Sequence, residues 1–279
     1  MKKSLVATLA AALLLSLSAC GGGGSDTNSS NDGSNNNQGG SDSNGGGTAD
    51  QGNQGSASAP FVAGANSRYL LLSSLATSFG VLASPQQSST DGAVTAVGGY
   101  QLSNPVVQGI AGDASFAIGR WVKGSVASSS GTATITNDKT SYHYLAYQAF
   151  SSFPSPNTQN CTVSNFTTPS NIAGPATAAA LGTSVTGTSV TLTVSSATAA
   201  TLTGSITVNA NNETASLSLP ANSLAPASMG NSGQILSSGA GTLVQVADVG
   251  NGSYGLAVMF RANMPSGASY VGVARLTCS

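Results

Sequence analysis

The side chains in this sequence best suited to covalent or acid–base chemistry are three cysteines and a single histidine, His143. A catalytic thiolate needs a base, and a metal site needs several His, Cys or carboxylate ligands close together. The chain has no second histidine, and we find no G-x-S-x-G turn, phosphate-binding loop or paired carboxylates in it. We therefore expect no enzymatic activity, no metal and no cofactor, and we interpret His143 as a core or surface residue of a strand.

Cys20 follows what reads as a secretory signal. Two lysines near the start precede an apolar run over residues 5–15 that is too short to span a bilayer. The four residues Leu17-Ser18-Ala19-Cys20 then resemble the lipobox of bacterial lipoprotein signals at every position. The resemblance implies removal of residues 1–19 and acylation of Cys20. The alternative is an ordinary signal cut after Ala19, which would leave Cys20 a spare thiol.

The segment after the signal has the composition of a tether. Residues 20–60 are almost wholly Gly, Ser, Asn, Gln and Asp, with too little apolar surface to offset the entropy of folding. About forty such residues reach roughly 35 Å. Gly21 stands where related lipoproteins retained in the inner membrane carry Asp, which implies transfer to the outer membrane. We expect residues 61–279 to form the folded module, facing either the cell surface or the periplasm.

The other two cysteines, Cys161 and Cys278, form an even pair in an exported chain. Such a pair most simply forms a disulfide. A Cys nucleophile paired with His143 has no clear third member and does not suit an oxidising compartment. The expected disulfide ties the chain end to the middle of the module.

The charge balance argues against nucleic acid as a partner. Once the two signal lysines are removed, six basic residues face nine acidic ones, giving a side-chain charge of −3. The basic residues form no cluster, whereas nucleic-acid binding needs several grouped phosphate contacts. A surface rich in Ser, Thr, Asn and Gly is instead typical of exported β proteins.

One short motif carries a resemblance to a known family. Residues 114–126 alternate as a strand, with Arg120 on the face opposite Gly119 and Trp121. Gly119-Arg120-Trp121 with Gly124, followed by Ser141-Tyr142-His143-Tyr144, resembles a pattern in exported β-barrel lipoproteins grouped with transferrin-binding protein B and factor H-binding protein. Arg120 and Trp121 are candidate binding anchors. We favour a structural role, in which the two glycines bend a strand at a barrel corner and Trp121 plugs the interior.

The remaining pattern is mostly that of strands. Residues 66–82 fit a short helix or two strands equally well. We expect a loop at 84–92, a strand at 93–102, an interrupted stretch at 103–113 and strands at 132–136 and 141–150. Alternation at 188–194 indicates another strand. Residues 202–209 and 214–219 should form a hairpin with Val208 opposite Ala215, residues 242–247 and 253–260 a second one with Val246 opposite Tyr254, and 270–277 the last strand.

These elements predict an all-β module, an antiparallel up-and-down barrel of about eight to ten strands. With the family resemblance, they indicate an outer-membrane lipoprotein that acts as a non-catalytic binding module for a protein partner. The contacts are expected in the loops at 154–160, 169–175 and 220–233. The alternatives are a small-molecule carrier with an open barrel cavity and a structural envelope protein.

Overall fold

The computed structural model describes residues 53–279, which form an all-β structure with antiparallel pairing between all named strands. Residues 1–19 and Cys20 lie outside the described residues, as does the expected tether up to residue 52. Residues 53–60 pack on the module: Gly55 forms an isolated bridge with Ile110, and the Ser58 hydroxyl donates to the Gly112 carbonyl. No helix within residues 53–279 has the length and apolar character to cross a membrane.

The first eight strands form what we call the N-terminal sheet, in the order β2-β1-β8-β6-β5-β4-β3. β6 pairs with β8 along its first half and with β7 along its second half. The bounds are β1 Ser67–Leu72, β2 Thr77–Val81, β3 Gln86–Gln87, β4 Val94–Val97, β5 Tyr100–Asp113, β6 Phe116–Ser128, β7 Gly131–Ile135 and β8 Tyr142–Ala149, with a 3₁₀ turn η1 at Asp138–Thr140.

The other strands form the C-terminal sheet, in the order β14-β15-β16-β17-β9-β11-β12-β13. β10 pairs with the start of β17. The bounds are β9 Asn157–Phe166, β10 Ser170–Ala173, β11 Gly182–Ser196, β12 Ala199–Ala210, β13 Glu213–Ser218, β14 Gly230–Gly233, β15 Gly241–Asp248, β16 Tyr254–Asn263 and β17 Ser269–Cys278, with a 3₁₀ turn η2 at Ile235–Ser237.

The two sheets are continuous, because the end of β8 pairs with the end of β15. The result is one antiparallel sheet of 17 strands that does not close. The all-β, antiparallel prediction is confirmed, whereas the barrel of eight to ten strands is not. Local hairpins can be inferred from sequence, but the pairings that decide the architecture, such as β1 with β8 and β9 with β17, join segments far apart in the chain.

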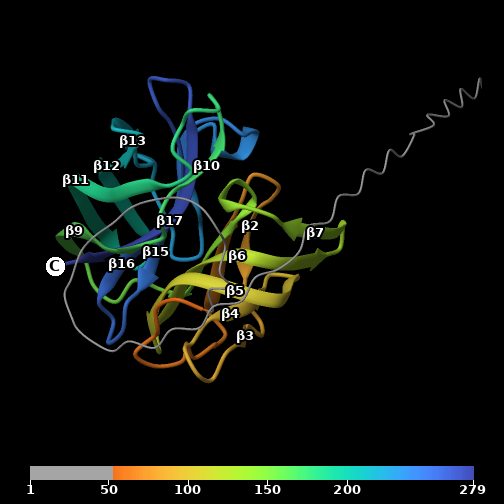
Figure 1. The fold of residues 1–279 in the computed structure, drawn as a ribbon. Coiled ribbons are helices and arrows are strands. Elements are labelled where there is room, and N and C mark those ends of the chain that lie inside the picture. Colours follow the sequence, from red (N-terminus) through yellow and green to blue (C-terminus); the bar gives the residue numbers. More distant parts are fainter. Residues whose placement is uncertain (1–52) are drawn as a thin grey trace, which may run out of the picture. The chain divides into compact units, whose positions relative to one another are not determined.

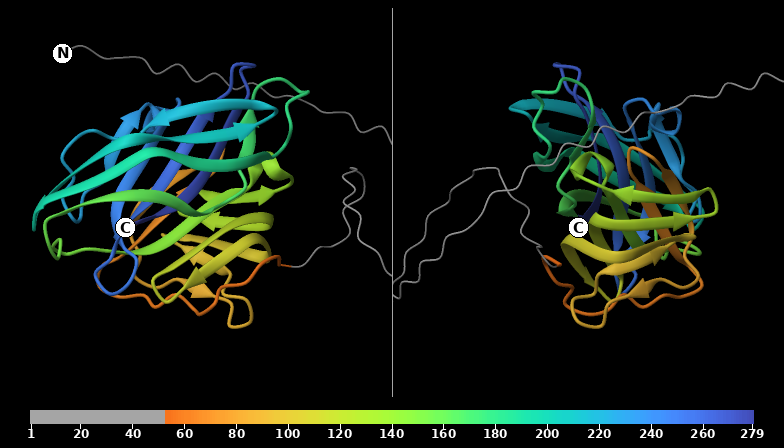
Figure 2. Two further views of the ribbon diagram at one scale, coloured as in Figure 1. Left: turned by 90° about the vertical axis from the view of Figure 1, so that its left-hand side faces the viewer. Right: turned by 45° about the vertical axis from the view of Figure 1, so that its right-hand side comes forward.

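Strands β15–β17 separate two hydrophobic cores, and each face of these strands packs in one of them. In Figure 1 the C-terminal strands β9 and β11–β13 lie on the left, β3–β7 on the right, and β15–β17 between them; Figure 2 shows the same grouping from two further sides. On β16, Leu256 and Val258 face the interior of the curled C-terminal sheet. The alternate residues Ala257 and Met259 face the N-terminal sheet, where they pack with side chains of β1, β6 and β8. A third core covers the other face of the N-terminal sheet.

Residues 66–82, for which the sequence fits a short helix or two strands equally well, contain two strands, β1 and β2. The expected single strand over 93–102 is wrong, because Gly98 and Gly99 take positive φ angles of 58° and 84° and turn the chain between β4 and β5. The interrupted stretch at 103–113 belongs to the long strand β5. Its ladder with β6 absorbs the expected interruptions as register shifts, one of them spanning Gly109 at a φ of 62°.

The two predicted hairpins differ in outcome. In β12–β13, Val208 faces Ala215 as predicted, and the backbone of Leu219 donates to Gly204. In β15–β16, Val246 faces Leu256 rather than Tyr254. The predicted β15–β16 register is therefore wrong by two residues. Because strand side chains repeat every two residues, a shift of two leaves each side chain on its expected face.

Candidate functional site

The motif found in the sequence forms a ladder between the adjacent strands β6 and β8. Gly119 lies opposite Tyr144, Arg120 opposite His143 and Trp121 opposite Tyr142. Neighbouring pairs of an antiparallel ladder point to opposite faces of the sheet. The motif therefore supplies an aromatic face and a polar face, which are buried in different cores.

The aromatic face is tightly packed. Trp121 is fully buried, and its ring centroid lies 5.9 Å from that of Tyr142 and 6.0 Å from that of Tyr144. The Trp121 indole N–H donates to the Val94 carbonyl at 2.7 Å, and the Val94 N–H donates to the Tyr144 hydroxyl at 3.1 Å. These two hydrogen bonds hold β4 against the side chains of Trp121 and Tyr144. The aromatic side chains thus stabilise the core.

The two glycines of the motif make room for this packing. A Cβ atom on Gly119 would lie 2.4 Å from the Tyr144 hydroxyl oxygen. Gly124, at a φ of 129°, lies where β6 changes partner from β8 to β7, and a Cβ there would lie 2.5 Å from the Ser103 carbonyl. Close approach explains Gly119, and both close approach and an unusual backbone conformation explain Gly124.

The polar face holds a buried charge. Arg120 is 3% exposed, and its guanidinium donates to the Asp138 carboxylate at 2.6 Å, to the Ser170 hydroxyl at 3.1 Å and to the Gln108 side-chain oxygen at 3.0 Å. Burial lowers the pKa of Arg120, whereas the attraction of Asp138 opposes that shift. A buried guanidinium that is paired and hydrogen-bonded is stable, but removing a partner would leave it uncompensated.

His143 extends this cluster toward the C-terminal sheet. Its Nδ1 lies 2.7 Å from the Thr167 hydroxyl, its Nε2 lies 3.0 Å from the Ser170 hydroxyl, and Ser170 also contacts the Ser141 hydroxyl at 2.8 Å. Complete burial and the positive charge of Arg120 hold the pKa of His143 well below its usual range. We call Arg120, Asp138, Ser141, His143, Thr167 and Ser170 the polar clamp, because it joins β6 and β8 to β10 and the loop before it.

The polar clamp contains a serine–histidine contact of the length found in hydrolases. Its environment differs from a catalytic site, since Ser170 and His143 are both 0% exposed and the second imidazole nitrogen meets a threonine hydroxyl instead of a carboxylate. A substrate carbonyl has no route to Ser170 in this arrangement. Within residues 53–279, no group of three or more His, Cys, Asp or Glu side chains is placed to hold a metal.

The predicted disulfide is confirmed. Cys161 on β9 and Cys278 on β17 lie directly opposite each other and are bonded across 117 positions of sequence. The next residue continues the ladder, because Ser279 and Asn160 exchange two backbone hydrogen bonds. The chain end is therefore fixed to the centre of the C-terminal sheet.

The interior of the C-terminal sheet is occupied by side chains. Large residues from facing strands meet there, and Phe150, Phe153 and Tyr254 pack with ring centroids 5.1 to 6.1 Å apart. Phe260 and Tyr270 are fully buried in the same core. Aromatic and aliphatic side chains therefore fill this part of the sheet's interior.

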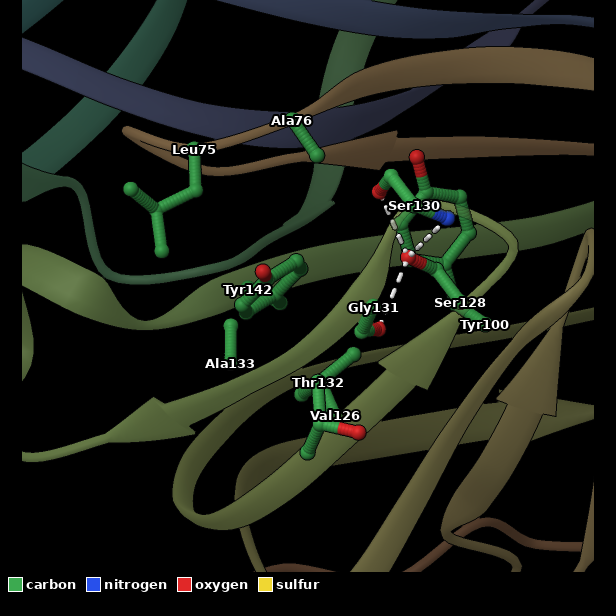
Figure 3. Close-up of a pocket in the computed structure, with 10 residues that line it drawn as sticks. All are labelled: Leu75, Ala76, Tyr100, Val126, Ser128, Ser130, Gly131, Thr132, Ala133 and Tyr142. Atoms are coloured by element: carbon green, nitrogen blue, oxygen red, sulfur yellow. Dashed lines mark hydrogen bonds between the residues drawn. The ribbon is translucent and has the colours of Figure 1, made fainter. Parts of the chain in front are cut away.

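A small hollow lies on the surface, beside the turn between β1 and β2. It has a volume of about 140 Å³ and lies between Leu75 and Ala76 of that turn, the rings of Tyr100 and Tyr142, and the β6–β7 hairpin. Figure 3 shows these groups around the hollow, with the Ser128 hydroxyl bonded to Ser130 and to the Gly131 carbonyl on one side. The hollow is too small to enclose a drug-sized ligand.

The turn belongs to a hairpin with unusual surface chemistry. Among residues 53–279, five large apolar side chains are exposed, and three of these lie on the β1–β2 hairpin: Leu75 (60%), Phe79 (39%) and Val81 (62%). The sequence alone does not predict this site, because residues 66–82 fit a short helix and two strands equally well. The alternation of Phe79 and Val81 with Ser78 and Gly80 was the signal that favours a strand.

The three loops in which we expected contacts differ in their exposure to solvent. Residues 154–158 are exposed. In contrast, the stretch 169–175 begins with buried residues, since Ser170 belongs to the polar clamp and Asn171 is 0% exposed. Leu224 and Gly230 of the third loop are also buried.

Comparisons with known proteins add no relative. The chain matches no protein-family model, and it has no significant match among curated proteins or solved structures.

Proposed function

We propose that this chain is a lipid-anchored protein of the outer membrane whose β module binds a protein partner without catalysing a reaction. The signal and Cys20 support the anchor, and the hydroxyl-rich composition with few charges supports an exported binding domain. The kinship with transferrin-binding protein B and factor H-binding protein is part of the same proposal. It rests on the ladder of Gly119–Trp121 with Tyr142–Tyr144.

The fate of the reactive side chains supports a non-catalytic role. His143, Ser170 and Arg120 are buried and bonded to one another, and Cys161 is bonded to Cys278. Such groups stabilise the union of the two sheets. What the module offers to other molecules is therefore its surface.

The observation that carries the proposal is the apolar exposure of the β1–β2 hairpin. Leu75, Phe79 and Val81 lie within seven consecutive residues, on a module with few charges. Grouped exposed apolar side chains mark protein or membrane contact sites, whereas single ones need no explanation. The hairpin is held in place by β8 on its inner side, which makes it a rigid site.

Affinity capture tests the binding role. The immobilised chain should retain a discrete protein from envelope extracts or host fluids, and the double variant Phe79→Ser/Val81→Ser should lose it. Val62→Ser is the matched control, because Val62 is as exposed as Val81, at 63% against 62%, but lies outside the hairpin. Equal capture by all three chains would refute the proposal. The origin of the captured protein separates a host-binding role from a structural role in the envelope.

Metabolic labelling tests the anchor. Cells grown with radioactive palmitate should label the wild-type chain and leave Cys20→Ser unlabelled, because the lipid is attached at the Cys20 thiol and the amino group that cleavage exposes. Protease treatment of intact cells then distinguishes the two faces of the membrane: release of the module indicates display outside, and complete protection indicates the periplasm. Labelling that persists in Cys20→Ser would contradict the assignment.

A further inference from the structure

The hydrogen bonds between β1 and β2 show which backbone groups of β2 point away from β1. Leu82 N–H donates to the Ser67 carbonyl at 2.9 Å, and Ser73 N–H donates to the Ala76 carbonyl at 2.8 Å. In an antiparallel ladder, hydrogen-bonded pairs recur at every second residue. Even-numbered residues of β2 therefore bond to β1. The N–H and C=O groups of Thr77, Phe79 and Val81 point away from β1.

These backbone groups form an unprotected sheet edge. Within residues 53–279, β2 pairs with β1 alone. The same three residues are the ones whose side chains are exposed, and residues 75–81 contain neither a charge nor a proline. Proteins usually protect a free edge with lysine, proline, a bulge or a covering segment, because an unprotected edge pairs with another strand.

We propose that this edge pairs with the same edge of a second copy of the chain, in antiparallel orientation about a two-fold axis at Phe79. The inference rests on the proposed function, since it names the partner of the β1–β2 hairpin. In this register Phe79 faces Phe79 of the second copy, and Thr77 faces Val81. Each of these pairs brings outward N–H and C=O groups together, for a total of about six backbone hydrogen bonds.

A second copy fits this edge for three reasons. An extended strand is the only element that satisfies alternating N–H and C=O groups in one row, and β2 is itself such a strand. The pairing sets two aromatic rings together and valine against threonine, both favourable cross-strand pairs. The nearest charge on this face, Arg68, lies opposite Val81 at the end of the strand, so the two copies of Arg68 lie at opposite ends of the paired region.

Cysteine cross-linking tests the register. Residues in a hydrogen-bonded antiparallel pair have Cα atoms about 5.5 Å apart, within the range of about 4.4 to 6.8 Å that a disulfide requires. Under mild oxidation of the full chain in detergent, Phe79→Cys should form at least tenfold more covalent dimer than Val62→Cys. Val62→Cys carries a thiol away from any strand edge, at a position that is more exposed than Phe79, at 63% against 39%. Equal cross-linking of the two variants would overturn the proposal.

Sedimentation equilibrium tests the role of the backbone. The wild-type chain should change from the chain mass to twice that mass as concentration rises. Phe79→Pro should stay at the chain mass, because proline removes an outward N–H and leaves every bond to β1 intact. Phe79→Thr, which keeps that N–H, should dimerise more weakly than wild type but more strongly than Phe79→Pro. Dimers unaffected by Phe79→Pro, or a wild-type chain that is monomeric throughout, would overturn the proposal.

The outcomes separate this proposal from the proposed function. A monomeric chain that still loses a captured protein on Phe79→Ser/Val81→Ser overturns the second copy as the partner and leaves the hairpin as a binding site for a different protein. A monomeric chain with hairpin-independent capture overturns both.

Discussion

Replacing Gly119 by alanine tests whether the aromatic ladder is as tightly packed as the structure implies. The new methyl carbon would lie 2.4 Å from the Tyr144 hydroxyl oxygen and 2.7 Å from the carbon that bears it. Tyr144 is fully buried and accepts a hydrogen bond from Val94, so its ring has little room to withdraw. The backbone of Gly119 is not left-handed. The substitution therefore tests space alone.

The cost follows from three contributions. Overpacking of a core costs about 1 to 3 kcal/mol. Displacing Tyr144 from Val94 costs about 1 kcal/mol more. Alanine also reduces the conformational entropy of the unfolded chain, which stabilises the folded state by about 0.5 kcal/mol. We expect Gly119→Ala to lower the free energy of unfolding by about 2.5 kcal/mol.

Urea unfolding provides the assay, with fluorescence of the single, fully buried Trp121 as the signal. Gly64→Ala is the control, because a Cβ there meets nothing nearer than 3.8 Å. Tyr144→Phe removes the nearest clashing atom, so Gly119→Ala should cost about 1 kcal/mol less in that background. If Gly119→Ala cost no more than Gly64→Ala, or if the two substitutions were additive, the packing argument would be refuted.

Three further predictions concern the disulfide and the polar clamp. Reducing Cys161–Cys278 should lower the free energy of unfolding by up to about 4.8 kcal/mol, seen as a fall in the urea midpoint with dithiothreitol; an unchanged midpoint would contradict the chain-entropy argument. Because burial holds the pKa of His143 below its unfolded value near 6.5, the unfolded chain binds a proton first as the pH falls. The contribution of His143 to the free energy of unfolding is thus fully present above about pH 6.5 and falls below that pH, by up to about 1.4 kcal/mol per pH unit. His143→Gln should flatten the stability profile between about pH 5 and 6.5, and an unchanged slope would argue against a neutral buried imidazole. Arg120→Met should lower the free energy of unfolding by about 2 kcal/mol, measured by urea unfolding, because it removes the partner of Asp138, whose side chain is 34% exposed, and the guanidinium donor to Ser170 and Gln108; a neutral effect would argue against these hydrogen bonds.

The sequence predicts local pairing well where alternation meets a short turn. The β12–β13 hairpin follows from one register that places Val208, Ile206 and their partners on a single face. In β15–β16 two registers two residues apart bury the same residues, so face alternation does not distinguish them. There the structure pairs Asp248 with Tyr254, beyond the predicted end of the first strand.

The architecture and the candidate site depend on long-range pairing. The sequence marks Arg120 and His143 as neighbours in a motif, but Thr167 and Ser170, which complete their hydrogen bonds, come from β10 and the loop before it and carry no local signal. The exposed edge has the same origin. Phe79 and Val81 resemble core residues in any sequence pattern, whereas in the structure they are exposed on a strand that, within residues 53–279, pairs with β1 alone.

The position of β15–β17 between two cores has a consequence for how the module opens. Met259 and Phe260 lie on opposite faces of β16, one in each core. If either sheet separates from β16, one of these faces is exposed to water, and the other core loses part of its support at the same time. The two halves are thus expected to melt in a single cooperative transition. Amide hydrogens along β16 should be the last to exchange with solvent, at a rate set by global unfolding.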